Sequence, residues 1–230
     1  MEAACAHRAS LNSTSLKLIA LIIMAIDHVG MVFFPAQMWL RAIGRIAMPI
    51  FAFCVAEGFT HTHSRKKYLL RLVIFAVISE LPFDLALSGG PDRTWQNVMF
   101  TFAFAVAALL CYELLNKKDD LPHRIASWTV VAAIALAAEL CSTDYGFSGV
   151  ALVFFFYILR GKPKAVRIFV SLVCFSAISM SLFEFWCLFS ALPLMLYNGE
   201  KGAGLKWTFY LFYPLHLLMI YLTLLGLMTI

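Results

Sequence analysis

The chain has 230 residues, of which 62% are hydrophobic and only 13% are charged. A soluble core of ordinary size cannot enclose that share of apolar side chains, so the composition excludes a soluble globular protein and indicates a polytopic membrane protein. The net charge of +5 does not indicate nucleic-acid binding, because the lysines and arginines are divided among alternate short loops, as in membrane proteins with a defined orientation. We therefore expect the lipid bilayer as a partner and no nucleic acid.

Long apolar runs follow one another along the chain and predict an all-α bundle of about nine transmembrane spans. We expect residues 1–15 to form a cytoplasmic amino-terminal segment and residues 16–230 to form one membrane domain. The sixth and eighth runs are shorter than the roughly 20 residues of a full crossing, so the sequence does not decide whether these two runs cross the membrane fully. The expected spans are Leu16–Phe34, Met38–Phe59, Tyr68–Leu87, Asn97–Leu115, Ile125–Leu140, Gly149–Leu159, Val166–Phe183, Phe185–Tyr197 and Trp207–Met228.

The basic residues of the loops predict the orientation of the bundle. Loops that face the cytoplasm contain an excess of lysine and arginine. On this rule the amino terminus lies inside and the carboxyl terminus outside. The basic loops are 60–67, 116–124, 160–167 and 198–206. In the opposite loops, 35–37, 88–96 and 141–148, Arg93 is the one lysine or arginine.

Charged residues near the ends of the first two spans are the most unusual feature of the sequence. Asp27 and His28 lie near the outer end of the first run, and Arg41 and Arg45 lie near the outer start of the second. An aspartate or arginine costs about 2.5–3.5 kcal/mol at a helix centre, so these residues indicate either a functional site or a structural ion pair. Adjacent helical residues point about 100° apart, so Asp27 and His28 face different neighbours.

We expect an arginine to keep Asp27 ionised, which leaves His28 free as a base or nucleophile. The structural alternative for His28 is a hydrogen bond to a neighbouring helix. Arg41 or Arg45 could stabilise a developing oxyanion, or could simply pair the helices through Asp27 or Asp84.

Further polar residues occur near the same predicted outer face. For Glu80 we favour a structural role, and for Asp84 the choice between a proton relay and an ion pair stays open. His216, midway along the ninth span, is more typical of a hydrogen-bonded bundle histidine than of a catalyst. His216 is an exception to this outer set. Its remaining members are Gln96 and Asn97 at the start of the fourth span, Glu139 and Asp144 at the end of the fifth, and Glu184 in the turn after the seventh.

Basic residues at the inner end of the third span could bind a phosphorylated cofactor. They include Lys67 and Arg71, which flank Tyr68. Orientation alone explains most of this charge. No P-loop or dinucleotide-binding glycine motif occurs, and the dispersed histidines and cysteines predict no metal site.

The sequence resembles the TraX family of membrane proteins over nearly its whole length. The stretches that support the resemblance are Ile26-Asp27-His28, Arg41-Ala42-Ile43-Gly44-Arg45, Ser79-Glu80-Leu81-Pro82-Phe83-Asp84, Gln96-Asn97-Val98-Met99-Phe100, Thr143-Asp144-Tyr145-Gly146 and Tyr213-Pro214-Leu215-His216.

The resemblance implies acetyl transfer by an integral protein of the bacterial cytoplasmic membrane. The family is associated with amino-terminal acetylation of conjugative pilin and is grouped with multi-span acyltransferases such as the lysosomal heparan-glucosaminide acetyltransferase. The implied donor is cytoplasmic acetyl-CoA. The implied acceptor is an amine or hydroxyl of a protein or glycan at the outer face.

The resemblance makes His28 the expected catalytic histidine, and the positions of the other polar residues suggest roles for them in the same reaction. Catalysis is expected from His28, Asp27, Arg41, Arg45 and Asp84, with His28 as general base or transient acetyl carrier. Acetyl-CoA is expected near Lys67, Tyr68 and Arg71. Binding of the acceptor is expected from Glu80, Asn97, Asp144, Tyr145 and His216.

Two other functions are compatible with the same residues. A proton-coupled transporter would use the Asp, His and Arg side chains as a relay. A non-catalytic assembly partner would bind a secreted or membrane subunit without using them. The sequence also leaves a homo-oligomer open.

Overall fold

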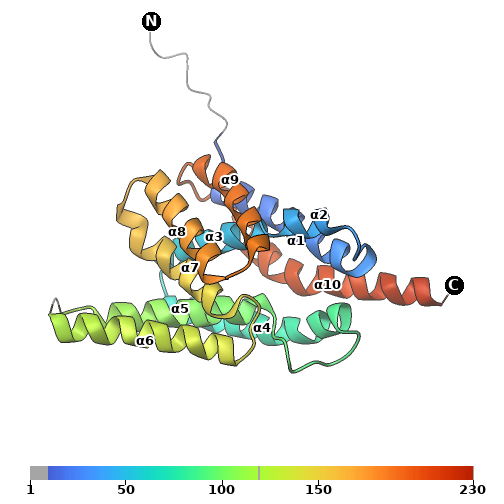
Figure 1. The fold of residues 1–230 in the computed structure, drawn as a ribbon, viewed down its shortest axis with the longest axis horizontal. Coiled ribbons are helices and arrows are strands. Elements are labelled where there is room, and N and C mark those ends of the chain that lie inside the picture. The colour runs from blue at the N-terminus through green and yellow to red at the C-terminus, as the bar shows by residue number, and fades with distance from the viewer. Residues whose placement is uncertain (1–9, 119, 230) are drawn as a thin grey trace, which may run out of the picture.

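A computed structural model describes residues 10–118 and 120–229 (Figure 1). Over these residues the chain is all-helical, as predicted, apart from isolated bridges that join Leu11 to Tyr197 and Gln96 to Thr143. The helices are α1 (Ser13–Phe33), α2 (Met38–Gly44), α3 (Ala47–His61), α4 (Arg65–Leu87), α5 (Val98–Leu115), α6 (Leu121–Leu140), α7 (Gly146–Ile158), η1 (Leu159–Gly161), α8 (Lys164–Ile178), η2 (Leu182–Ser190), α9 (Ala191–Met195) and α10 (Lys206–Met228).

The first helix begins earlier than its apolar run. Asn12 accepts a hydrogen bond from the Ser15 N–H at 2.9 Å and so caps α1, which starts at Ser13. A side-chain oxygen at this position satisfies one of the unpaired N–H groups of the first turn. The predicted amino-terminal segment 1–15 therefore overlaps the helix at its end, and its residues 1–9 lie outside the described part of the chain.

All nine expected spans coincide with helices, but not all of these helices are typical membrane spans. By length and composition, five stretches of the described chain could cross a bilayer: Ser13–Phe33, Met38–His61, Val98–Leu115, Leu121–Leu140 and Trp207–Met228. Gly146–Gly161 and Leu182–Met195 are shorter apolar helices. The chain is thus a multi-helix membrane protein, whereas about nine crossings and the orientation stay predictions.

The eighth expected span differs most from its prediction. Leu182–Ser190 forms a 3-10 helix, and only the five residues Ala191–Met195 are α-helical. Glu184, expected in a turn between helices, lies in the first turn of this 3-10 helix. A 3-10 helix rises about 2.0 Å per residue, compared with 1.5 Å for an α-helix. The segment therefore spans a greater distance than an α-helix with the same number of residues.

Interactions at the ends of the helices bring the predicted cytoplasmic loops together at one end of the bundle, which we call the basic end. Arg65 at the start of α4 and Tyr157 near the end of α7 both bind Glu113 of α5. The Lys164 ammonium donates a hydrogen bond to the Tyr197 carbonyl at 2.9 Å. The partition of loops inferred from their charge is therefore the partition found in the structure.

The loops with few basic residues meet at the opposite end, which we call the site end. The Gln96 N–H donates to the Ser142 carbonyl at 2.9 Å, and the Asp144 N–H donates to the Gln96 carbonyl at 2.8 Å. These bonds join the segment before α5 to the segment before α7. Arg45, between α2 and α3, reaches Glu184 of η2 at the same end.

The first and last helices run in parallel, beginning together at the basic end. The Ser13 N–H donates to the Glu200 carbonyl, and the Thr14 hydroxyl donates to the Ala203 carbonyl, both at 2.8 Å. Figure 1 shows α10 lying along α1 from this point. His28, near the site end of α1, consequently lies against Tyr213 and His216 in the middle of α10.

Candidate functional site

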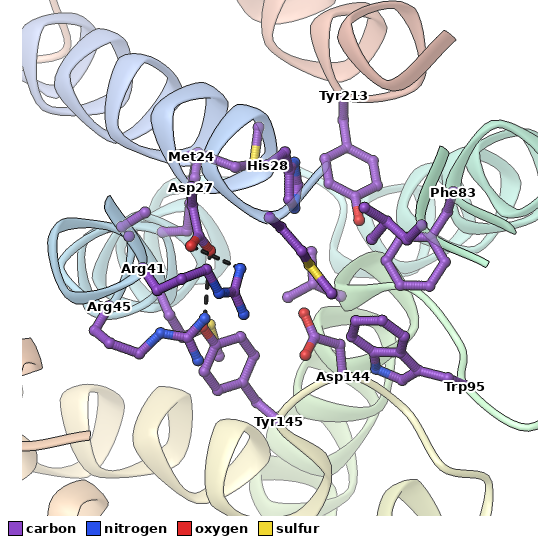
Figure 2. A pocket seen from close by; sticks show the side chains of 17 residues that line it. Met24, Asp27, His28, Arg41, Arg45, Phe83, Trp95, Asp144, Tyr145 and Tyr213 are labelled. Carbon is purple, nitrogen blue, oxygen red and sulfur yellow. Dashed lines mark hydrogen bonds and ion pairs between the residues drawn. The ribbon is translucent and has the colours of Figure 1, made fainter. Parts of the chain in front are cut away.

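A cavity of about 160 Å³ lies at the site end, between α1, α2, α4, α10 and the segment before α7 (Figure 2). Pockets that enclose a whole drug-sized ligand measure about 300–1,000 Å³, so this cavity suits a small reacting group. Its polar and aromatic lining residues are Asp27, His28, Arg41, Arg45, Phe51, Phe83, Trp95, Asp144, Tyr145 and Tyr213.

Asp27 forms ion pairs with both arginines, as predicted. Its two carboxylate oxygens lie 2.7 Å from Arg41 Nη1 and 3.3 Å from Arg45 Nη2. Gly44 makes this possible, because a Cβ at this position would overlap the Asp27 carboxyl group. Asp27 is buried, and a buried carboxylate is stable only when it is paired and hydrogen-bonded.

The two arginines are used differently. Arg45 also donates from Nη1 to Glu184 at 2.9 Å, and its guanidinium lies 5.5 Å from the Tyr145 ring centroid. Arg41 binds Asp27 through Nη1 and has no other partner among the described residues, and its side chain is 23% exposed. The remaining N–H groups of Arg41 therefore have no partner among the described residues, whereas on Arg45 the buried Nε lacks one.

His28 faces away from Asp27 and contacts the last helix. Its Nδ1 lies 2.8 Å from Nε2 of His216, whose Nδ1 lies 2.9 Å from the Phe212 carbonyl. Figure 2 shows the His28 ring extending from α1 into the cavity, beside Tyr213. His216 is buried behind it, so the structure places His216 in contact with His28 rather than among the cavity-lining residues.

Asp144 and Tyr145 enter the cavity from a strained segment. Ser142 and Tyr145 have positive φ angles of 52° and 63°, which cost a residue with a side chain about 1–2 kcal/mol. The segment is held by hydrogen bonds to Gln96 and by the buried Thr101 hydroxyl, which donates to the Asp144 carbonyl. Backbone strain maintained by surrounding contacts is a frequent feature of functional sites.

Burial raises the pKa of the Asp144 carboxyl to about 7, although the Arg45 guanidinium opposes this shift. Its protonation state therefore changes near neutral pH. A group with this property can give and accept protons under physiological conditions.

Three of the predicted site residues lie next to the cavity without lining it. The Asn97 side chain donates to Glu80 and to the Ala76 carbonyl, and its oxygen accepts from the Met99 N–H to cap α5. Asp84 accepts from the Asp92 N–H at 3.0 Å. Neither Glu80 nor Asp84 forms an ion pair with a described arginine. These contacts fix the segment that contains Trp95.

The residues expected to bind acetyl-CoA lie toward the basic end. The Arg71 guanidinium lies 5.7 Å from the Tyr68 ring, and its buried Nε has no hydrogen-bond partner among the described residues. Lys67 is exposed. Phe83 of the cavity lies twelve residues further along α4, which corresponds to about 18 Å.

Sequence reasoning missed the aromatic side of the cavity. Trp95 and Tyr213 both line it, yet aromatic residues make up 15% of this chain, so neither position stands out. The available signal was the position of Tyr213, three residues before His216. Within the described residues, no cluster of His, Cys, Asp and Glu side chains could hold a metal ion.

Comparison with known proteins gives a consistent group of relatives. The family model described as "TraX protein" matches residues 12–224. The chain is 30% identical to the "Probable fimbrial assembly protein FimC, serogroup H1" of Dichelobacter nodosus, over 90% of this chain and 93% of that protein. It is 31% identical to "Protein TraX" of Escherichia coli, over 66% of this chain and 58% of that protein. The match thus spans little more than half of the Escherichia coli relative, and no solved structure matches.

Proposed function

Because the chain belongs to the TraX family, we propose that it is an integral membrane acetyltransferase of the bacterial cytoplasmic membrane. It transfers an acetyl group from cytoplasmic acetyl-CoA to an amine or hydroxyl acceptor at the outer face. The observation that supports this most is the cavity. It is lined by His28, by Arg41 with N–H groups that have no partner among the described residues, and by Asp144, whose pKa is about 7. The relative named for fimbrial assembly supports a pilus subunit as acceptor, with a glycan as the other candidate.

In this proposal His28 is the general base. Its Nε2 accepts the proton from the acceptor N–H or O–H as the new bond forms to the acetyl carbon. The same proton then passes to the departing thiolate, so His28 returns to its neutral form and the products are the acetylated acceptor and a free thiol. General acid–base catalysis of this kind contributes typically 10²–10⁴-fold to a rate.

Arg41 is the better candidate for stabilising the oxyanion of the tetrahedral intermediate. Its unused N–H groups face a cavity enclosed by aromatic side chains, where a fixed cation acts more strongly than in water. Arg45 is already held by Asp27 and Glu184. We assign Asp27 and Arg45 to positioning Arg41, and Asp84 to positioning the adjacent segment.

The residues at the basic end fit the donor. Arg71 is a half-buried cation beside the Tyr68 ring, and Lys67 is an exposed cation, so their charged side chains can bind phosphate groups. Bound acetyl-CoA supplies the activated acetyl thioester. The cavity is large enough for the acetyl end alone, in keeping with separate sites for the nucleotide and the reacting group.

The acceptor approaches from the site end. Asp144 and Tyr145 form one wall of the cavity there, and the bonds between Glu80 and Asn97 fix the segment at the opposite side. An acidic side chain that is uncharged below about pH 7 and charged above it can accept a hydrogen bond from an incoming amine or hydroxyl.

Purified protein in liposomes, labelled acetyl-CoA and candidate acceptor peptides and sugars test the proposal. We expect labelled acceptor from the wild type, and a loss of about 10²–10⁴-fold for His28→Ala. His123→Ala is the matched control, because His123 pairs with Asp120 at the start of α6, away from the cavity. Wild-type activity in His28→Ala would exclude the assigned role.

The same liposomes test for a transporter, and an experiment in cells tests for an assembly partner. Ligand-dependent proton flux without acetylated product would indicate a transporter. Normal pilus assembly in cells that contain a chain altered at Asp27, His28 and Arg45 together would indicate a non-catalytic assembly partner. Either result would contradict the transferase.

A further inference from the structure

The contacts of His216 determine where its proton lies. A backbone carbonyl can only accept a hydrogen bond, so the 2.9 Å contact between His216 Nδ1 and the Phe212 carbonyl requires a proton on Nδ1. In a neutral imidazole the other nitrogen is then an acceptor. His216 Nε2 thus presents a lone pair toward His28.

The proton on His28 follows from the same logic. His28 Nδ1 lies 2.8 Å from His216 Nε2, and a hydrogen bond between them requires that His28 Nδ1 be the donor. In neutral His28 the proton is then on Nδ1, and Nε2, at the far end of the ring, is the unprotonated nitrogen. Nε2 has no hydrogen-bond partner among the described residues.

The ring geometry supports a directed bond. The two ring centroids lie 5.1 Å apart and the ring planes differ by 16°. With the two nitrogens 2.8 Å apart, this centroid separation is reached only when both nitrogens lie near the line between the centroids, so the N–H of one ring and the lone pair of the other lie close to a common plane. The Phe212 ring stacks on His216 with a centroid distance of 5.0 Å and an interplanar angle of 13°. The Tyr213 ring packs against His216 at 5.6 Å. His216 is therefore fixed in position as well as in protonation.

We propose that His216 is the positioning residue for His28: it fixes the tautomer in which Nδ1 is protonated and the Nε2 lone pair faces the cavity. This inference rests on the proposed function for its catalytic consequence, but the arrangement of protons can be measured without any reaction. The two residues are separated by 188 positions in the sequence, and the parallel packing of α1 and α10 brings them together.

The pair also has a role during transfer. When His28 Nε2 takes the acceptor proton, the ring becomes positive, and the bond from its Nδ1–H to His216 Nε2 becomes charge-assisted and stronger. His216 keeps its own proton on Nδ1, because the Phe212 carbonyl cannot take it. No net proton leaves the pair, since His28 returns its proton to the thiolate.

The direct test is nitrogen NMR of the full-length protein in detergent or nanodiscs with ¹⁵N-labelled histidine. The chain has six histidines, and the His28 signals are those lost in His28→Ala. Near neutral pH we expect a protonated Nδ1 and an unprotonated Nε2 for His28. In His216→Phe nothing fixes this choice, so the Nε2-protonated form should appear. A protonated Nε2 in the neutral wild-type ring, or an unchanged spectrum in His216→Phe, would overturn the inference.

Kinetics provide the second measurement. Loss of a partner that fixes a histidine tautomer at metal sites costs about 10–100-fold, so we expect His216→Phe to lower kcat by a similar factor while the KM for acetyl-CoA is unchanged. His216→Gln can still accept a hydrogen bond through Oε1 and should keep more activity than His216→Phe. The matched controls are His123→Phe and His123→Gln. Equal kcat in His216→Phe and the wild type would contradict the positioning role.

The two measurements separate the inference from the function on which it rests. If the tautomer is as stated but no acetyl transfer occurs, the proposed function fails and the proton arrangement stands. If acetyl transfer occurs with the opposite tautomer, only the role of His216 fails. If His216→Phe does not fold, the wild-type spectrum and His216→Gln decide the question.

Discussion

Gly44 shows how a single missing side chain shapes the site. Asp27 reaches Arg41 and Arg45 at the same time because its carboxyl group occupies the space that a Cβ on residue 44 would need. The glycine is buried within α2, so its role is close packing rather than an unusual backbone angle.

We therefore expect Gly44→Ala to displace Asp27 and to destabilise the protein by about 1–3 kcal/mol, the usual cost of overpacking. Thermal unfolding in detergent would measure it. Gly226→Ala is the matched control, because a Cβ there meets open space on α10 and alanine favours a helix. Equal melting temperatures for Gly44→Ala and the wild type would show that Asp27 can move at little cost.

Asp144 makes the stability of the protein depend on pH. Its pKa in the folded protein is raised to about 7 by burial, with Arg45 opposing the shift, so the unfolded chain releases this proton first as the pH rises. Stability from this group is present at low pH and is lost as the pH rises from about 4 to 7. The melting temperature of the wild type, relative to that of Asp144→Asn, should fall as the pH rises over this range. Above about pH 7 the difference between the two melting temperatures should stay constant.

Asp92→Asn is a control of opposite sign. Hydrogen bonds from the Thr94 hydroxyl and N–H lower the pKa of the exposed Asp92 carboxyl. The wild type should therefore lose stability relative to Asp92→Asn as the pH falls toward and below about 4. If the Asp144 and Asp92 variants showed the same pH trend, the raised pKa of Asp144 would be wrong.

At the scale of single elements, the segment between α6 and α7 depends on α5 for its conformation. Thr101 of α5 is fully buried, and its hydroxyl lies against the Asp144 carbonyl and 3.1 Å from the Thr143 hydroxyl. These hydrogen bonds and those to Gln96 offset the energy cost of the positive φ angles in the segment.

Thr101→Val keeps the shape of the side chain but removes these hydrogen bonds. Leaving buried polar groups unsatisfied costs about 1–3 kcal/mol, so we expect a lower melting temperature and a lower rate of the proposed acetyl transfer. Thr129→Val is the matched control, because Thr129 is exposed on α6 and bonds only to the Ile125 carbonyl of its own helix. A surface change of this kind stays within about 0.5 kcal/mol. Equal effects of the two substitutions would argue against a special role for Thr101.

The elements also show what could be predicted from sequence. The pairing of Asp27 with Arg41 and Arg45 was predictable, because only a short turn separates α1 from α2 and the ionic residues lie on either side of it. The contact between His28 and His216 was not, because hydropathy does not determine which helices become neighbours. The 3-10 conformation of Leu182–Ser190 also has no distinct periodic signal in so apolar a stretch.

At the scale of the whole molecule, the loops sort into two ends as their charges predicted. Charge identifies which loops share an end, whereas packing of α1 beside α10 determines how the cavity closes. The bundle arrangement and the predicted orientation together place the cavity near the outer leaflet and the proposed donor site near the cytoplasm.

Labelling of single cysteines in a cysteine-free background tests this orientation. An impermeant maleimide added to intact spheroplasts should label Arg93→Cys at the site end and Thr229→Cys after α10. Lys118→Cys at the basic end should react only after permeabilisation. All three positions are exposed. The opposite pattern would invert the bundle, and labelling of Thr229→Cys together with Lys118→Cys would show that α10 does not cross.

The parallel contact between α1 and α10 has a consequence for biosynthesis. The ribosome completes His28 almost two hundred residues before His216, so a nascent chain can form the carboxylate–guanidinium contacts of its first hairpin long before the imidazole pair exists. The histidine acquires its fixed proton only when α10 has docked. A polypeptide whose translation stops short of this helix should therefore contain the early ionic contacts yet lack the proposed transferase activity.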